Sequence, residues 1–184
     1  MIGAGGVVAC AGSGAAMAAS EGGLATDFTF ETIEGPLPLS RYAGKVILVV
    51  NTASKCGFAP QLSSLETLWS TYRDRGLVVI GVPSGDFGGQ ELANAREIKT
   101  FCAMEFGVTF PLTVKTTVSG KNAHPFYRWA SRVRPGSEPR WNFHKYLVGR
   151  DGHLAAVFPT AVDPMETEVV KAVEAALGAA QVGG

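Results

Sequence analysis

One cysteine stands at a point of the chain where a thiol could react. Cys56 lies in the stretch NTASKCGFAP, residues 51–60, between the apolar run Val46–Val50 and a segment with helical spacing. In open α/β sheets, ligands gather where the strands end. Backbone N–H groups at a helix start, together with the neighbouring Lys55, favour a thiolate, which is the nucleophilic form of cysteine. Position alone leaves two interpretations open, a nucleophile or a buried structural cysteine.

Composition argues against several other functions. The chain has 184 residues, of which 46% are hydrophobic and 17% charged, and its formal net charge is +0. These values are typical of one globular domain with a real core, and they give no electrostatic reason to expect nucleic acid or anionic lipid as a partner. The 3 cysteines cannot all pair within one chain, and their spacing matches no zinc pattern. We therefore expect no metal and no bound cofactor.

The N-terminal segment differs in composition from the rest. Residues 1–22 carry no charge before Glu21, and the AMA sequence at 16–18 fits a secretory cleavage site, although a positive n-region is missing. Cys10 lies in a sequence that also resembles a lipoprotein box. We expect residues 1–22 to be an export signal or a disordered tail, and residues 23–184 to be the domain. The protein would then be exported (periplasmic or extracytoplasmic) if the segment is a signal, and cytoplasmic otherwise.

The elements that must position Cys56 alternate between strand and helix patterns. In chain order we expect a hairpin at 27–39, strands at 45–51 and 77–83 around a helix at 60–76, a helix at 94–106, a short strand at 110–114, paired strands at 145–148 and 154–158, and a last helix at 164–177. This order predicts an α/β, thioredoxin-like fold with a central mixed sheet flanked by helices and an N-terminal β-hairpin. An insertion precedes the closing pair of strands.

Four short motifs carry a resemblance to a known family. NTASKCG at residues 51–57 resembles the N-x-A-S-x-C/U-G motif of the glutathione peroxidases. FGGQE at 87–91, GVTFP at 107–111 and WNF at 141–143 resemble three further motifs of that family, in the same order and spacing. The resemblance runs from about residue 27 to residue 177, nearly all of the chain outside its N-terminal segment.

The resemblance implies a peroxidase. Carried over by position, Cys56 is the peroxidatic residue, and Gln90, Trp141 and Asn142 are its partners in a catalytic tetrad. The indole N–H and the two amides are hydrogen-bond donors that bring no competing nucleophile, and they can stabilise the oxygen that leaves as charge develops on it. We expect hydrogen peroxide and organic or lipid hydroperoxides as substrates.

Cys102, in the expected helix at 94–106, bears on the reductant. Composition alone favours a buried thiol on the apolar face of that helix. The resemblance instead implies the resolving cysteine of the non-selenium, thioredoxin-dependent members. In that cycle the Cys56 sulfenic acid condenses with Cys102, and thioredoxin or a similar dithiol reduces the disulfide. Because a disulfide requires Cα atoms within roughly 7 Å, we expect this helix to be mobile.

The chain departs from the family pattern at several positions. Ser84 stands where a cysteine is common in the non-selenium group, and Gly85-Asp86 changes the loop that enters the site. Ala130–Arg140 is short compared with the corresponding segment of tetrameric relatives, so we expect a monomer or a weak dimer.

Other functions stay open at this point. One is a one-cysteine, glutathione-dependent peroxidase, although no arginine cluster can be assigned to the carboxylates of glutathione. Another is a thiol–disulfide redox sensor, although Gly57-Phe58-Ala59 follows Cys56 where a C-x-x-C motif would place a second cysteine. A third is a binding module that kept the fold and lost the chemistry.

Overall fold

A computed structural model describes residues 23–179 of the chain. The strands are β1 (Thr29–Thr32), β2 (Gly35–Pro38), β3 (Val46–Thr52), β4 (Leu77–Pro83), β5 (Lys145–Val148) and β6 (Leu154–Phe158), and the α-helices are α1 (Gln61–Tyr72), α2 (Ala95–Phe106), α3 (Pro125–Val133) and α4 (Thr167–Gly178). No helix among these residues is long and apolar enough to span a membrane. The expectations for residues 1–22, on export, lipidation or disorder, lie outside the described residues.

The central sheet is mixed, as predicted. Its strand order is β4-β3-β5-β6, and β1 pairs with β2 in a separate hairpin. β3 and β4 run parallel and every residue of both is buried, which explains their unbroken apolar sequences. β5 runs antiparallel to β3, with Lys145 opposite Val50.

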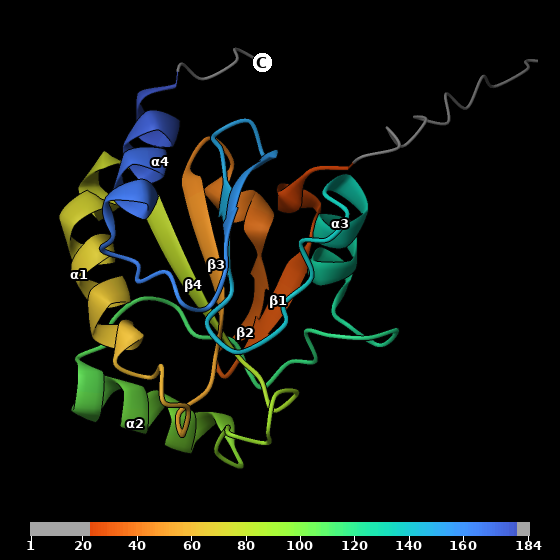
Figure 1. Ribbon diagram of the computed structural model, residues 1–184, viewed down its shortest axis with the longest axis vertical. Helices are drawn as coiled ribbons and strands as arrows, with labels where there is room; N and C mark the ends of the chain where they lie inside the picture. Colours follow the sequence, from red (N-terminus) through yellow and green to blue (C-terminus); the bar gives the residue numbers. More distant parts are fainter. Residues whose placement is uncertain (1–22, 180–184) are drawn as a thin grey trace, which may run out of the picture.

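Two layers cover the sheet (Figure 1). α1 and α4 lie on one face, while α3 and the β1-β2 hairpin lie on the other. Each face has its own buried cluster of apolar side chains, one including Leu48 and Leu147, the other including Val49 and Tyr146. α2 lies beyond the end of the sheet at which the chain leaves β3.

Most predicted elements are confirmed within a few residues, but the strand expected at 110–114 is wrong. Only one bridge forms there, between Leu112 and Gly81 of β4. Gly81 donates its N–H to the Pro111 carbonyl, and Thr113 donates back to Gly81. The next residue, Val114, already donates to Glu31 of the hairpin, so the chain leaves β4 before a strand can form.

Two helices also differ from the prediction. α3 was not predicted, because its segment was interpreted only as an insertion. Pro125 occupies its first position, and the His124 side chain caps it by accepting the Phe126 N–H. α4 begins at Thr167 rather than Pro164, because Asp163 accepts the Met165 N–H and folds the preceding residues into a turn. The expected monomer or weak dimer stays a prediction.

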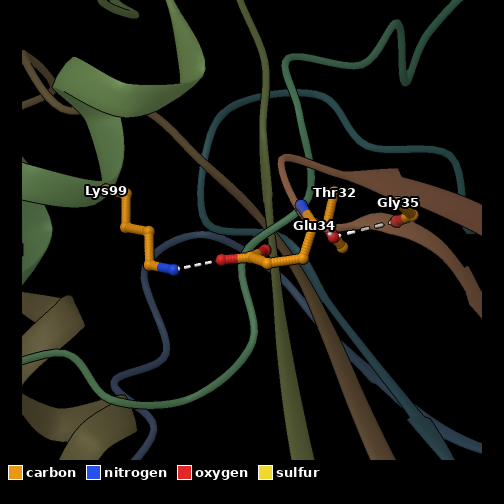
Figure 2. Close-up of polar contacts among 4 residues, drawn as sticks. All are labelled: Thr32, Glu34, Gly35 and Lys99. Carbon is orange, nitrogen blue, oxygen red and sulfur yellow. Dashed lines mark hydrogen bonds and ion pairs between the residues drawn. The ribbon is translucent and has the colours of Figure 1, made fainter.

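α2 has the bounds that its sequence indicates, and it is tied to the hairpin. The Asn94 side chain caps it by accepting the Glu97 N–H at 3.0 Å, and Gly107 ends it with a φ of 67°. Figure 2 shows Lys99 of α2 in an exposed ion pair with Glu34 at the turn between β1 and β2. Thr32 closes the same turn by donating to the Gly35 carbonyl at 2.9 Å.

Candidate active site

Cys56 lies in a series of tight turns between β3 and α1. Its N–H donates to the Ala53 carbonyl at 3.3 Å, and its own carbonyl accepts the Ala59 N–H at 2.9 Å. α1 begins only at Gln61, with Pro60 as its N-cap. This start agrees with the helix predicted from residue 60. Because the helix dipole acts mainly within the first turn, its effect on a thiol that precedes the helix by several residues is small. The Cys56 residue is 6% exposed, which leaves little room for solvent.

Gln90 and Asn142 meet in the structure. The Asn142 Nδ2 donates to the Gln90 Oε1 at 3.0 Å, although the two residues are 52 positions apart. Asn142 is completely buried. The backbone of Gln90 is bound to the cysteine loop as well, since the Lys55 N–H donates to the Gln90 carbonyl at 2.8 Å. Gln90 is therefore attached through its backbone to the residue that precedes Cys56, and Asn142 is attached to the side chain of Gln90.

Trp141 is the most exposed of the four candidates. It is 39% exposed, as is Phe58, two residues after Cys56. The ring of Phe87 lies 6.0 Å from the Trp141 ring, centroid to centroid, at an angle of 43°. These aromatic side chains come from the cysteine loop, the FGGQE segment and the WNF segment. Phe87 and Trp141 form an aromatic pair, and Phe58 adds a partly exposed ring two residues after Cys56.

The backbone of the WNF segment is held by side chains. The carbonyls of Trp141, Asn142 and Phe143 accept, in turn, from Asn51 Nδ2 at 3.1 Å, Thr160 Oγ1 at 2.7 Å and Lys145 Nζ at 2.7 Å. In addition the Phe143 N–H donates to the Asn51 carbonyl. Phe143 has a φ of 63°, the one positive value at a non-glycine residue between 23 and 179. Such a conformation is disfavoured unless its surroundings over-determine it.

Glu91 is part of the FGGQE motif, but no role was predicted for it from the sequence. The Glu91 carboxylate is buried, and its Oε1 accepts the N–H groups of Ser54 at 3.1 Å and Leu92 at 2.8 Å. Glu91 therefore adds a second connection between the FGGQE segment and the cysteine loop. A charged residue beside Gln90 in an otherwise uncharged stretch was the signal available in the sequence.

Cys102 lies inside the core, as its place on the apolar face of α2 predicts. It is 1% exposed and belongs to the same buried cluster as Cys56. Both cysteines are free thiols. Burial, with a further contribution from the negative charge of Glu91, raises the pKa of Cys102 to about 12. A thiol in this environment is a poor nucleophile while α2 stays folded.

In the loop after β4, Ser84 and Asp86, two residues that depart from the family pattern, have structural roles. Ser84 is fully buried, and its Oγ accepts the Asp86 N–H at 3.3 Å. The Asp86 carboxylate accepts the N–H groups of Val118 at 2.7 Å and Ser119 at 3.0 Å. Asp86 therefore fixes the loop to the segment before α3. Within residues 23–179, no cluster of three or more His, Cys, Asp or Glu side chains is arranged to hold a metal ion.

Comparison with known proteins decides the family. The glutathione peroxidase family model matches residues 26–131. The chain belongs to the glutathione peroxidase family. It is 42% identical over 146 residues to a glutathione peroxidase of Lactococcus lactis, covering 77% of this chain and 93% of the relative. It is also 43% identical over 136 residues to a glutathione peroxidase-like peroxiredoxin of Schizosaccharomyces pombe, covering 72% and 86%.

Solved structures agree with the fold. The crystal structure of apo Trgpx superposes with a TM-score of 0.69 at 33% identity, covering 85% of this chain and 96% of that one. A thiol:disulfide interchange protein of Chlorobium tepidum, at 19% identity and a TM-score of 0.60, shares the thioredoxin-like fold alone. The fold prediction is confirmed, and the chain is a peroxidase of the glutathione peroxidase family.

Proposed function

We propose that this peroxidase reduces hydrogen peroxide and organic or lipid hydroperoxides at Cys56, and that Gln90, Trp141 and Asn142 assist. One observation carries the proposal. The Gln90 and Asn142 amides, from segments 52 residues apart, are hydrogen-bonded at the loop that bears Cys56. Two amides brought together at a buried thiol suit the stabilisation of a leaving oxygen better than they suit simple packing.

In the first step the Cys56 thiolate attacks one oxygen of the peroxide. The O–O bond breaks, the sulfur becomes a sulfenic acid, and the other oxygen takes a proton and leaves as water or an alcohol. The amide of Gln90 and the indole of Trp141 donate hydrogen bonds to that departing oxygen. Asn142 holds the Gln90 amide in place.

In the second step Cys102 restores the enzyme. Its thiol attacks the sulfenic sulfur, an S–S bond forms, and water leaves. Thioredoxin or a similar dithiol then reduces the disulfide by exchange, ending as the oxidised partner. Because Cys102 is 1% exposed in the core, this step requires the part of α2 around Cys102 to open.

The aromatic side chains of Phe58, Phe87 and Trp141 favour the proposal that hydroperoxides with a hydrocarbon chain are substrates. A relative from Synechocystis, 40% identical over 149 residues, is a hydroperoxy fatty acid reductase by name. Partly exposed aromatic side chains on the segments that carry the proposed catalytic residues offer apolar surface to an alkyl chain, which hydrogen peroxide lacks. We therefore propose a lower KM for fatty-acid hydroperoxides than for hydrogen peroxide.

Steady-state turnover with both peroxides tests the function, with thioredoxin and glutathione compared as reductants. Cys56→Ser should abolish turnover and keep the fold, because a serine hydroxyl is a far weaker nucleophile at neutral pH. Cys102→Ser is the matched control. It should reduce one equivalent of peroxide and then stall with thioredoxin. Turnover that survives in Cys56→Ser would remove Cys56 from the reaction.

The deep burial of Cys102 favours one alternative, a one-cysteine enzyme that uses glutathione. In that case the Cys56 sulfenic acid would form a mixed disulfide with glutathione, and a second glutathione would release it. Full turnover of Cys102→Ser with glutathione would establish this route. Cys102 would then be an ordinary residue of the core.

A further inference from the structure

The position of Lys145 in β5 is not explained by packing alone. It is completely buried, and it lies opposite Val50, whose side chain is part of the apolar cluster under α1 and α4. An apolar residue would fill such a position without desolvating a charge. No ion pair involving Lys145 forms among residues 23–179. Burial lowers the pKa of Lys145 to about 8, and the negative charges of Asp163 and Glu166, in the turn before α4, oppose that shift.

Within residues 23–179, the one hydrogen bond that the Lys145 ammonium makes goes to the WNF segment. Its Nζ donates to the Phe143 carbonyl at 2.7 Å, directly after the residue that binds Gln90. Phe143 is the residue with the left-handed φ of 63°, where a side chain beyond glycine is disfavoured. Thr160 and Asn51 hold the carbonyls of Asn142 and Trp141 in the same way.

This arrangement fixes the direction of Asn142. A residue in the left-handed conformation reverses the local course of the chain, so rotation at Phe143 would carry the preceding side chain away from Gln90. Of the three holding groups, only Lys145 is attached to Phe143 through its side chain. A charge-assisted hydrogen bond is also the strongest kind that can be made to a carbonyl.

We propose that Lys145 is a positioning residue for peroxide reduction: its ammonium holds the Phe143 carbonyl and thereby keeps Asn142 against Gln90 at the Cys56 thiol. The inference rests on the proposed role of Cys56. It assigns Lys145 no contact with the peroxide, because its effect passes through the backbone of the WNF segment.

Lys145→Met tests the proposal, because methionine keeps the length and apolar stem of lysine and removes the donor. Lys171→Met, at an exposed position on α4, is the matched control. The measurement is the second-order rate constant for oxidation of Cys56 by hydrogen peroxide in a single turnover, without reductant. We expect a fall of about tenfold in Lys145→Met, equivalent to roughly 1.4 kcal/mol in the barrier, and no change in Lys171→Met.

Two further readouts separate positioning from a structural role. The rate of Cys56 alkylation by iodoacetamide should change much less than the peroxide rate, because alkylation has no departing peroxide oxygen to stabilise. The Tm should stay level or rise, since the variant removes a buried charge. Thr160→Val, which frees the Asn142 carbonyl, should show the same selective loss, and it decides the matter if Lys145→Met does not fold.

Two results would overturn the inference. One is a peroxide rate within twofold of the wild-type rate in a folded Lys145→Met, or, if that variant does not fold, in Thr160→Val. The other is an equal loss of the peroxide and alkylation rates. Failure of the proposed function itself looks different, because Cys56→Ser would then still consume peroxide.

Discussion

At the scale of single residues, the orientation of the Gln90 and Asn142 amides determines which N–H groups of the site are free to donate a hydrogen bond. Asn142 Nδ2 donates to Oε1 of Gln90, so the Gln90 amide is held through its oxygen. Its Nε2 donates no hydrogen bond to any residue between 23 and 179, so in the proposed mechanism it can donate to an oxygen of the peroxide. In that mechanism the buried Asn142 amide acts as a support, and the partly exposed Gln90 amide supplies the donor.

The first residue-scale prediction is that Gln90→Glu slows peroxide reduction, although the two side chains have nearly the same size. The carboxylate can still accept from Asn142, so the fold should stay intact, but the donor is lost and a negative charge faces the developing negative charge. We expect a loss of about 1–3 kcal/mol of transition-state stabilisation, measured from the second-order rate constant. Trp141→Phe, which removes the indole N–H and keeps one aromatic ring without adding a charge, should lose less. Unchanged rates in both variants would reduce these residues to scaffold.

A second residue-scale prediction follows from the charge of Lys145. Burial lowers its pKa from 10.5 to about 8, against the opposing effects of Asp163 and Glu166. The folded protein therefore binds fewer protons than the unfolded chain between about pH 8 and pH 10.5. The free energy of unfolding should rise with pH across that window through this group. Below about pH 8 the cost of the buried charge, roughly 3 kcal/mol at about 1.4 kcal/mol per pKa unit, is fully present.

Lys145→Met should lack this pH dependence. Urea unfolding of both proteins at several values between about pH 7 and pH 10 measures it, and the advantage of the variant should shrink as the pH rises. Parallel stability curves for the two proteins would show that the pKa of Lys145 is the same in the folded and unfolded states, so that burial does not lower it. A full slope of about 1.4 kcal/mol per pH unit already at pH 7 would instead show that Lys145 is neutral in the folded core, and its hydrogen bond to Phe143 would then be an ordinary neutral one.

At the scale of elements, the bounds of α2 could be predicted from the sequence, but its ion pair with the β1-β2 hairpin could not. Its cap at Asn94, its end at Gly107 and its buried Cys102 all follow from local sequence pattern. The ion pair between Lys99 and Glu34, 65 residues apart, does not (Figure 2). Side chains at such separation meet only through the folded arrangement of the hairpin and α2.

We expect Glu34→Gln to loosen this tether by a small amount. Both side chains are more than half exposed, at 53% and 62%, and ion pairs this exposed to water contribute little to stability. If α2 must open for Cys102 to react, disulfide formation after peroxide treatment should accelerate by no more than about fivefold. The first oxidation of Cys56 should be unchanged. An acceleration far above that limit would mean that the ion pair is a principal barrier to opening.

The sequence allowed prediction of elements and motifs, but it did not indicate how the WNF segment is held. Apolar runs defined β3 and β4 because both faces of those strands are buried. Asn51, Thr160 and Lys145 went unassigned, because each acts on a backbone carbonyl brought near by the fold. The strand expected at 110–114 failed for a related reason, since hydrogen bonds to two different elements divide that segment. A lone lysine heading an apolar strand was the one local hint.

At the scale of the whole molecule, the two cysteines lie within one packed unit. Cys56 and Cys102 share a buried cluster with residues of the central sheet, α1 and α4. Interiors of this kind are close-packed and do not deform continuously. In the proposed cycle, Cys102 reaches the Cys56 sulfur by the opening of part of this unit. Redox state and stability should therefore be linked in this protein.

The last prediction concerns that link, and it rests on the proposed disulfide cycle. A disulfide between Cys56 and Cys102 would close a loop whose constraint on the unfolded chain is worth roughly 4 kcal/mol. Opening α2 exposes Ile98, at 1% exposure, and Cys102, and a fully buried aliphatic side chain contributes about 1.5–3 kcal/mol. We expect the protein oxidised with one equivalent of peroxide to gain far less than 4 kcal/mol in its free energy of unfolding. Amide exchange should become faster in α2 while β3 and β4 keep their protection. Chemical unfolding and hydrogen-exchange mass spectrometry on both redox forms measure these effects, and peptide mapping identifies the linkage. A full gain in stability with unchanged exchange in α2 would mean that the two thiols join without any opening of the helix.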